Sequence, residues 1–428
     1  MRSCLRLASF ALVAALSAPA LDAQTPIPPV RADHPAIKAA LETIKADNAW
    51  TIEQQVSICE IPAPPFKEER RAAEMKRRFE SLGLSNVRID SIGNVIGEYR
   101  GEGDGPTVMV NAHLDTVFPE DTDVAVTRAG TLLKGPGIGD DCRGLATILA
   151  VARAFKLAKV QTNGTILFIA NVGEEGPGNL RGVRYLFRKP PTRIDYVVAV
   201  DGTGLGIVTG AVGSNRYKVS FKGPGGHSYG AFGMPSPIHA MGRAIAKMAD
   251  MRVPTSPKTT FNVGIVEGGT SVNTISPLGA MDVDLRSESA EELARLDATF
   301  RKAVADGLKE ENDRWPESKA KVTVDIEDRG VRPASLRKDE APIARVAYNA
   351  GVTLGFKAEM GAGSTDANIP MSLGVPAITL DGGGQGRGAH SMTESYDDGD
   401  RGYLGPQWVA LVVSALAGVR GSEARVVP

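Results

Sequence analysis

Four short apolar runs, rich in β-branched residues, recur along the chain and stop abruptly at polar or glycine-rich segments. They cover residues 107–111, 165–171, 196–200 and 377–380. Near-continuous apolar runs of this length are typical of strands that are buried on both faces of a parallel sheet. Residues 145–157 and 342–354 instead place apolar side chains at helical spacing. The pattern predicts an α/β domain with a mostly parallel sheet flanked by helices.

The pattern changes between residues 212 and 328. There it predicts a strand, a helix, two strands, a second helix and a last strand, at residues 216–221, 237–251, 260–266, 279–285, 290–311 and 320–326. This βαββαβ order is the ferredoxin-like arrangement. We therefore expect a second domain over residues 212–328, inserted into a first domain that comprises residues 24–211 and 329–428.

The N-terminus has the composition of a secretory signal peptide. Residues 1–23 combine two arginines, a short apolar stretch and a run of small residues. The apolar stretch is too short to span a bilayer. The sequence therefore predicts an exported protein, periplasmic or secreted, without a membrane anchor. Cys59 and Cys142 remain after cleavage, and the sequence alone leaves open whether they pair.

Composition narrows the class of partner. Hydrophobic residues make up 42% of the chain and charged residues 23%, as in an ordinary soluble globular protein. The 49 basic and 50 acidic residues nearly balance, and no cluster of Lys and Arg is interleaved with aromatic residues. Nucleic acid is therefore not an expected partner, because its binding depends on clustered positive charge.

Side chains of the kind that bind divalent metals follow the apolar runs or precede the helix at 145–157. They are, in chain order, His113, Asp115, Asp140, Asp141, Glu174, Glu175, Asp201 and His390. Ligands bind at the carboxyl ends of strands in open parallel sheets. Imidazoles and carboxylates are ligands of Zn²⁺, and an excess of carboxylates is typical where two ions share one of them. Each residue alone has an ordinary reading as a capping, turn or surface residue, but together they predict a metal centre.

Five motifs in a fixed order resemble the two-zinc exopeptidase family of carboxypeptidase G and peptidase T (tripeptide aminopeptidase). That family also includes succinyl-diaminopimelate desuccinylase and acetylornithine deacetylase. The motifs are His113-Leu-Asp115, Gly135-Pro-Gly-Ile-Gly-Asp140-Asp, Gly173-Glu-Glu-Gly, Gly225-Gly-His227-Ser and the late His390. The resemblance covers nearly the whole mature chain. It implies a zinc-exopeptidase-type fold in which the inserted ferredoxin-like domain serves as lid and dimerisation surface.

The resemblance also implies a ligand set for two Zn²⁺ ions, with Co²⁺ or Mn²⁺ as alternatives. Asp140 would bridge the ions, His113 and Asp201 would complete one site, and Glu175 and His390 would complete the other. The choice of Asp140 over Asp141 follows the family pattern. This chain departs from that pattern immediately afterwards, with Cys142-Arg143 where many members carry a lysine and a glycine.

The resemblance implies further roles around these ligands. Glu174 would be the general base and then the general acid, and Asp115 would hydrogen-bond His113 and fix its tautomer. His227 would stabilise the substrate carbonyl oxygen from the lid of a partner subunit. Asn273 and Arg286 would bind the substrate carboxylate; for Arg286, an ordinary surface charge at a strand end is an equal reading.

The sequence predicts an exopeptidase that hydrolyses an amide bond of short peptides. We expect an aminopeptidase, because an aspartate at position 201 tends to accompany aminopeptidases and dipeptidases in the family that it resembles. The alternative is a carboxypeptidase or an N-acyl-amino-acid amidohydrolase with the same metals. A remote alternative is a non-catalytic peptide-binding protein that keeps the fold.

Overall fold

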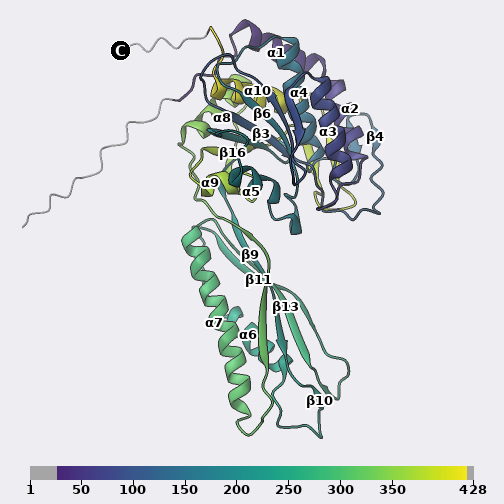
Figure 1. Cartoon of the computed structure of the whole chain (residues 1–428), viewed down its shortest axis with the longest axis vertical. Coiled ribbons are helices and arrows are strands. Elements are labelled where there is room, and N and C mark those ends of the chain that lie inside the picture. Colours follow the sequence, from purple (N-terminus) through teal and green to yellow (C-terminus); the bar gives the residue numbers. More distant parts are fainter. Residues whose placement is uncertain (1–26, 422–428) are drawn as a thin grey trace, which may run out of the picture.

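The computed structural model describes residues 27–421, so the expected signal peptide lies outside the described residues. The chain folds into a large domain and an elongated small domain that extends away from it (Figure 1). Among the described residues, no helix is both long and apolar enough to cross a membrane.

The helices of the large domain lie mostly before the small domain in sequence. They are α1 (Pro35–Ala46), α2 (Asn48–Cys59), α3 (Glu69–Ser81), α4 (Cys142–Leu157), α5 (Arg181–Arg188), α8 (Pro342–Thr353), α9 (Asn368–Ser372) and α10 (Leu404–Ala417), with a 3₁₀ turn, η1, at Gly176–Gly178. The predicted helices at 145–157 and 342–354 correspond to α4 and α8.

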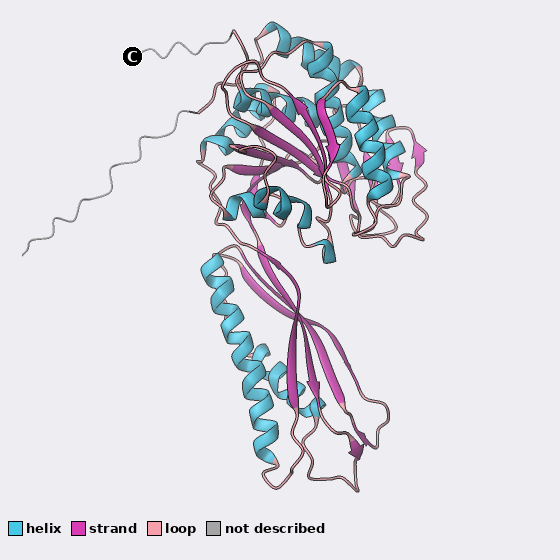
Figure 2. Cartoon of the chain, viewed as in Figure 1, coloured by secondary structure: helices cyan, strands magenta, loops and turns pink. Residues whose placement is uncertain are grey.

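An eight-stranded mixed sheet forms the centre of the large domain (Figure 2). In spatial order its strands are β1 (Ser85–Ile89), β2 (Val95–Tyr99), β6 (Ile166–Asn171), β3 (Val108–His113), β7 (Tyr196–Val200), β16 (Ala377–Leu380), β8 (Ile207–Ala211) and β15 (Met360–Gly363). The four central strands, which are the four predicted ones, run parallel. Antiparallel pairing is confined to the flanks, where β1 joins β2, β2 joins β6 and β8 joins β16.

Helices bury both faces of this sheet, as the continuous apolar runs predict. Val108 and Val110 of β3 join a core with α1, α4, α8 and α10 on one face. Met109, between them, points to the opposite face, where it joins a core with α5 and α9. A peripheral sheet of β4 (Thr127–Ala129), β5 (Leu132–Lys134), β17 (Gln385–Arg387) and β18 (Ser395–Asp397) lies beside the loop that contains Asp140.

The small domain has the predicted βαββαβ order. Its elements are β9 (Gly213–Lys222), α6 (Pro237–Ala249), β11 (Thr259–Gly268), β13 (Leu278–Ser287), α7 (Ala290–Arg314) and β14 (Thr323–Arg332), with a short ladder of β10 (Gly226–His227) and β12 (Thr274–Ile275). The strand order β11-β13-β9-β14 is antiparallel throughout. Both helices pack on one face, where Val219, Phe221 and Phe300 form the core. The other face of the sheet is left open.

Candidate metal centre

The carboxyl ends of β6, β3 and β7 meet at one edge of the large sheet. His113 is the last residue of β3, Glu175 follows β6 and Asp201 follows β7. Asp140 lies in the loop before α4, and His390 lies in the loop between β17 and β18. Because β3 pairs in parallel with both of its neighbours, the three strand ends deliver their polar residues to the same place.

Asp140 lies between two imidazoles. His113 Nε2 is 3.0 Å from Asp140 Oδ1, and His390 Nε2 is 3.0 Å from Asp140 Oδ2. His390 Nε2 is also 2.9 Å from Glu175 Oε1. Ligand atoms of His113, Asp140 and Glu175 all lie within 4.8 Å of one another. A carboxylate with one imidazole on each oxygen has the arrangement expected of a group that bridges two cations.

The cleft carries an excess of negative charge. Burial, together with the negative charge of Asp140, raises the pKa of Asp201 to about 7. Among the described residues, nothing donates a hydrogen bond to the Asp201 carboxylate. Hydrogen bonds from His390 to Asp140 and Glu175 raise the pKa of that imidazole to about 10. The carboxylates around His390 therefore favour a positive charge at this position. The donor set of imidazoles and carboxylates suits Zn²⁺ or a similar dication.

Asp115 fixes the tautomer of His113 through its main chain. His113 Nδ1 is 3.0 Å from the Asp115 carbonyl oxygen and 3.6 Å from Asp115 Oδ1. Donation from Nδ1 leaves Nε2 as the ligand atom. The Asp115 carboxylate accepts the backbone N–H groups of Glu174 and Glu175, at 3.0 and 2.8 Å. Asp115 thus contacts His113 as expected, but it does so through its carbonyl oxygen. Its carboxylate positions the main chain of Glu174 and Glu175.

The two adjacent aspartates have different surroundings. Asp141 caps α4, because its Oδ1 accepts the Gly144 N–H at 3.0 Å, while Oδ2 accepts the His113 N–H at 2.9 Å. Both of its oxygens are thus used inside the fold. The peptide bond between Asp140 and Asp141 is cis. Only Asp140 presents its carboxylate to the imidazoles, as the family pattern implied.

Glu394, which the sequence did not single out, holds the loop that contains Asp140. Its buried carboxylate accepts the N–H groups of Gly137, Gly139 and Asp140 at 2.9, 2.8 and 3.0 Å. Gly137 has φ +78°, and a Cβ there would lie 2.7 Å from the Thr116 side chain. Three donors on one carboxylate fix the main chain on the N-terminal side of Asp140.

Arg332 is a second residue that sequence reasoning missed. It is the last residue of β14, and its Nη1 donates to Glu174 Oε1 at 2.8 Å while Nη2 donates to the Glu174 carbonyl oxygen. Nη1 also lies 3.1 Å from Ser364 Oγ. Arg332 and Glu174 are both buried. Burial raises the pKa of Glu174 well above its ordinary value, and the guanidinium acts in the opposite direction.

The structure does not bring His227 and Asn273 to the metal centre of the same chain, whereas Arg286 lies at the near end of the small domain, where Ser214 of β9 pairs with both Arg286 and Arg332. His227 and Asn273 lie together at β10 and β12, where Ser228 N donates to Asn273 O at 2.9 Å. This ladder is at the end of the small domain farthest from the large domain (Figure 1). His227 is exposed, and its Nδ1 accepts two backbone N–H groups at 3.3 Å. Arg286, on β13, donates to Asp284 Oδ2 at 2.7 Å.

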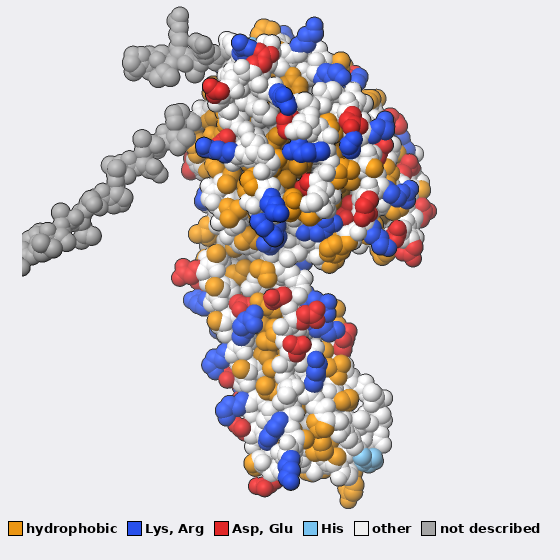
Figure 3. All heavy atoms as spheres, viewed as in Figure 1, with side chains coloured by type: hydrophobic (Ala, Val, Ile, Leu, Met, Phe, Trp, Pro, Cys, Tyr) orange, Lys and Arg blue, Asp and Glu red, His pale blue; other side chains and the backbone are white. Residues whose placement is uncertain are grey.

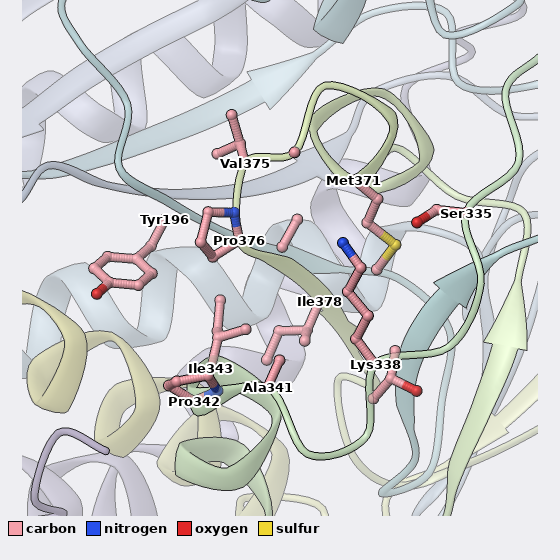
Figure 4. A pocket seen from close by; sticks show the side chains of 13 residues that line it. Tyr196, Ser335, Lys338, Ala341, Pro342, Ile343, Met371, Val375, Pro376 and Ile378 are labelled. Atoms are coloured by element: carbon pink, nitrogen blue, oxygen red, sulfur yellow. The ribbon is translucent and has the colours of Figure 1, made fainter. Parts of the chain in front are cut away.

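Two of the cavities among the described residues are candidate places for a ligand. One of about 160 Å³ adjoins Asp140 and is lined by four glycines together with Thr203, Arg387, Ala389 and Glu394. Another of about 170 Å³, shown in Figure 4, lies at the amino ends of β7 and β16, where Tyr196 and Pro376 line it. Its lining is largely apolar and contains none of the predicted site residues. The cavity beside Asp140 is therefore the one that suits the chemistry.

Comparison with known proteins places this fold and site in a family. Residues 109–404 match the model of the peptidase family M20/M25/M40. The chain is 28% identical to carboxypeptidase G2 from Pseudomonas sp. over 342 residues, which cover 76% of this chain and 78% of that protein. It is 26% identical to the uncharacterised protein YqjE from Bacillus subtilis over 354 residues, covering 77% and 89% of the two chains.

Solved structures share the architecture. The aminopeptidase PepT from Bacillus cereus superposes with a TM-score of 0.71 at 22% identity, covering 88% of this chain and 99% of that one. A dinuclear metal-binding M20 peptidase from Bacillus subtilis gives a TM-score of 0.62 at 18% identity, covering 87% and 98%. The chain therefore belongs to the peptidase family M20/M25/M40. It is a metal-dependent hydrolase of the peptidase and amidohydrolase class, so the reading as a non-catalytic binding protein is set aside.

Proposed function

We propose that this protein is an exported two-metal aminopeptidase that hydrolyses short peptides. The observation that carries the proposal is the position of Asp140 between His113 and His390, with one imidazole on each carboxylate oxygen. Export rests on the signal-peptide character of residues 1–23. Figure 3 supports a small-molecule substrate, because basic and acidic side chains are mixed over the visible face without a large patch of one sign.

The residues present fit a pair of divalent cations. His113 and Asp201 would hold one ion, Glu175 and His390 the other, and Asp140 would bridge them. Two such ions supply a water molecule with a lowered pKa and polarise the carbonyl of the bond to be cleaved. Zn²⁺ suits these ligands, and Co²⁺ or Mn²⁺ accepts the same set.

Glu174 is the residue placed to move the proton. Its carboxylate neighbours the ligand Glu175, and the Asp115 carboxylate fixes the main chain of both glutamates. Arg332 contacts Oε1 and leaves the second oxygen, Oε2, for a proton taken from the attacking water. Delivery of that proton to the leaving amine completes the hydrolysis by general acid catalysis.

In this proposal, the substrate-binding residues His227 and Asn273 of the small domain are supplied by a second subunit. His227 uses Nδ1 within its own turn, so Nε2 remains to donate to the substrate carbonyl oxygen. Exposed apolar side chains lie near it in the sequence, including Tyr229, Phe232 and Val272. We propose a homodimer formed through the small domain, in which the partner subunit's His227 reaches this metal centre. The partner's Asn273 would bind the substrate carboxylate together with Arg286, which lies at the opposite end of β13, beside the strand position of Arg332.

The choice between the two ends of the peptide rests on Asp201 and on the PepT-like fold. A second candidate, a carboxypeptidase or N-acyl-amino-acid amidohydrolase, is favoured by the identity with carboxypeptidase G2 over most of both chains. The two candidates share the metal centre and differ in the substrate terminus that must be free.

A panel of di- and tripeptides with free, N-blocked and C-blocked ends separates the candidates. We expect cleavage of free tripeptides, weaker cleavage of C-blocked ones because they lack the carboxylate that Asn273 and Arg286 would bind, no cleavage of N-blocked ones, and loss of all activity after treatment with a chelator. Cleavage of N-blocked peptides would favour the second candidate. Activity that survives complete removal of metal would reject both.

A further inference from the structure

Cys59 and Cys142 lie far apart in the sequence but adjacent in the fold. Cys59 is the last residue of α2, and Cys142 is the first residue of α4. The Cys142 N–H donates to the Gly137 carbonyl oxygen at 3.2 Å, next to the Pro136 carbonyl oxygen that the Cys59 thiol contacts, so both cysteines meet the same turn. Both side chains are completely buried and belong to a small apolar cluster with Ile138, Leu133 and Tyr396. Both thiols are free in the structure.

The surroundings hold the two sulfur atoms in place. Gln55, one turn before Cys59 in α2, donates from Nε2 to the Ile138 carbonyl oxygen at 2.7 Å. The Cys59 thiol itself donates to the Pro136 carbonyl oxygen at 3.4 Å. The end of α2 is therefore already bound to residues 135–141, the loop that contains Asp140. Cys142 directly follows that loop in the sequence. A disulfide between Cys59 and Cys142 would therefore link the C-terminal end of the loop to the end of α2.

We infer that Cys59 and Cys142 form an intramolecular disulfide when the chain folds in an oxidising environment. One thiolate attacks a small external disulfide and releases a thiol, and the second thiolate then displaces the other thiol from the mixed disulfide. Two protein thiols and one external disulfide thus give one protein disulfide and two small thiols. The bond would restrict the unfolded chain and brace the loop that contains Asp140. This inference rests on the positions of the sulfurs and is independent of the proposed function.

Mass spectrometry of the full chain tests the bond directly. A Cys4→Ser background leaves only the two thiols in question, and the protein is refolded in a buffer of oxidised and reduced glutathione. Alkylation in denaturant followed by trypsin should give peptides 46–67 and 135–143 linked, lighter by two hydrogen atoms than their sum. Both peptides should be alkylated only after reduction. Separate alkylated peptides at equilibrium in the oxidising buffer would overturn the inference.

A thermal melt then tests the bracing role. Adding reductant should lower the Tm of the oxidised protein by roughly 5 °C, because the closed loop is long. The matched controls Cys59→Ser and Cys142→Ser should show no response to reductant. An unchanged Tm in a chain shown to be linked would reject the bracing role. The mass measurement needs neither control, so it decides the existence of the bond even if the serine variants fail to fold.

Discussion

The metal centre and the far end of the small domain both hold residues predicted to act on substrate, but they are built in opposite ways. At the metal centre His113 is only 2% exposed, and hydrogen bonds fix its ring on both sides. At the far end of the small domain His227 is exposed on a two-residue strand. Buried strand ends can set ligand positions within one chain, whereas an exposed ladder gains its function only when something else covers it.

The comparison separates two kinds of functional residue. Asp115, Asp141 and Glu394 orient the metal loops through backbone N–H groups, so their effect is present before any ligand arrives. In our proposal, His227 and Asn273 instead act on the substrate of a second subunit, so they depend on the formation of a dimer. The predictions below test each side of this contrast, beginning with the largest expected effect.

Glu174→Gln should remove the base and leave the ligands. We expect kcat to fall roughly 10³-fold, because general acid–base catalysis contributes about that much, while the metal content per chain stays unchanged. Steady-state kinetics together with elemental analysis measures both. Glu317→Gln, at an exposed position of the small domain, is the matched control and should behave as wild type. Undiminished turnover in the Glu174 variant would reject the assigned base.

His227→Ala should lower kcat roughly 10²-fold, since loss of one donor to a developing oxyanion has about that cost. Mixing this variant with Glu174→Gln tests where His227 acts. If the residue acts across subunits, mixed dimers contain one complete site and activity reappears on mixing. If it acts within one chain, every site stays defective and no activity returns. His239→Ala, also in the small domain and mostly exposed, controls for loss of an imidazole there.

Arg332 links the small domain to Glu174, so its substitution should affect both alignment and protonation. Arg332→Lys keeps the charge but cannot make both contacts, and we expect kcat to fall roughly 10-fold. Arg332→Gln also removes the positive charge that opposes the raised pKa of Glu174. The base must be ionised, so a higher pKa moves the acid limb of the kcat–pH profile to higher pH.

The Lys variant supplies the control for that shift. Its acid limb should stay closer to the wild-type position, because the charge is retained. Coincident profiles for the wild type and the Gln variant would show that Arg332 does not influence the protonation of Glu174.

Glu394→Gln should have the smallest effect. The amide oxygen can still accept from two backbone donors, but the amide nitrogen cannot accept the third. We expect metal affinity to fall about 10-fold, as is usual for residues that orient ligands. Competition with a chromophoric chelator measures this. An affinity equal to that of wild type would mean that the loop before Asp140 needs no such support.

The sequence predicts those elements whose burial leaves a clear pattern of apolar residues. The four central strands and the helices α4 and α8 follow apolar runs, and the order of the small domain follows its alternating strands. β14 continues to Arg332, beyond the predicted strand at 320–326, and the sequence misses this extension because residues 327–329 are charged and exposed and interrupt the apolar pattern. β15 is half-exposed and rich in glycine, so it carries no apolar run and the sequence does not predict it.

The residues that support the site were hidden for a different reason. Glu394 and Arg332 are single charged residues in polar segments, and a charge that is buried in the fold looks the same in sequence as one on the surface. The clustering of His113 and Glu175 could be predicted because the parallel strands β3 and β6 bring their carboxyl ends together. The position of His227 could not, because it depends on the contacts of the small domain and not on a local pattern.

Anomalous diffraction at the zinc absorption edge, from crystals grown with Zn²⁺, tests the central claim most directly. We predict two peaks, one beside each carboxylate oxygen of Asp140, with His113 Nε2 near one peak and His390 Nε2 near the other. The separation should be about 3.5–4 Å, as in other two-metal hydrolases. No peak, a single peak, or two peaks that do not share Asp140 would contradict it.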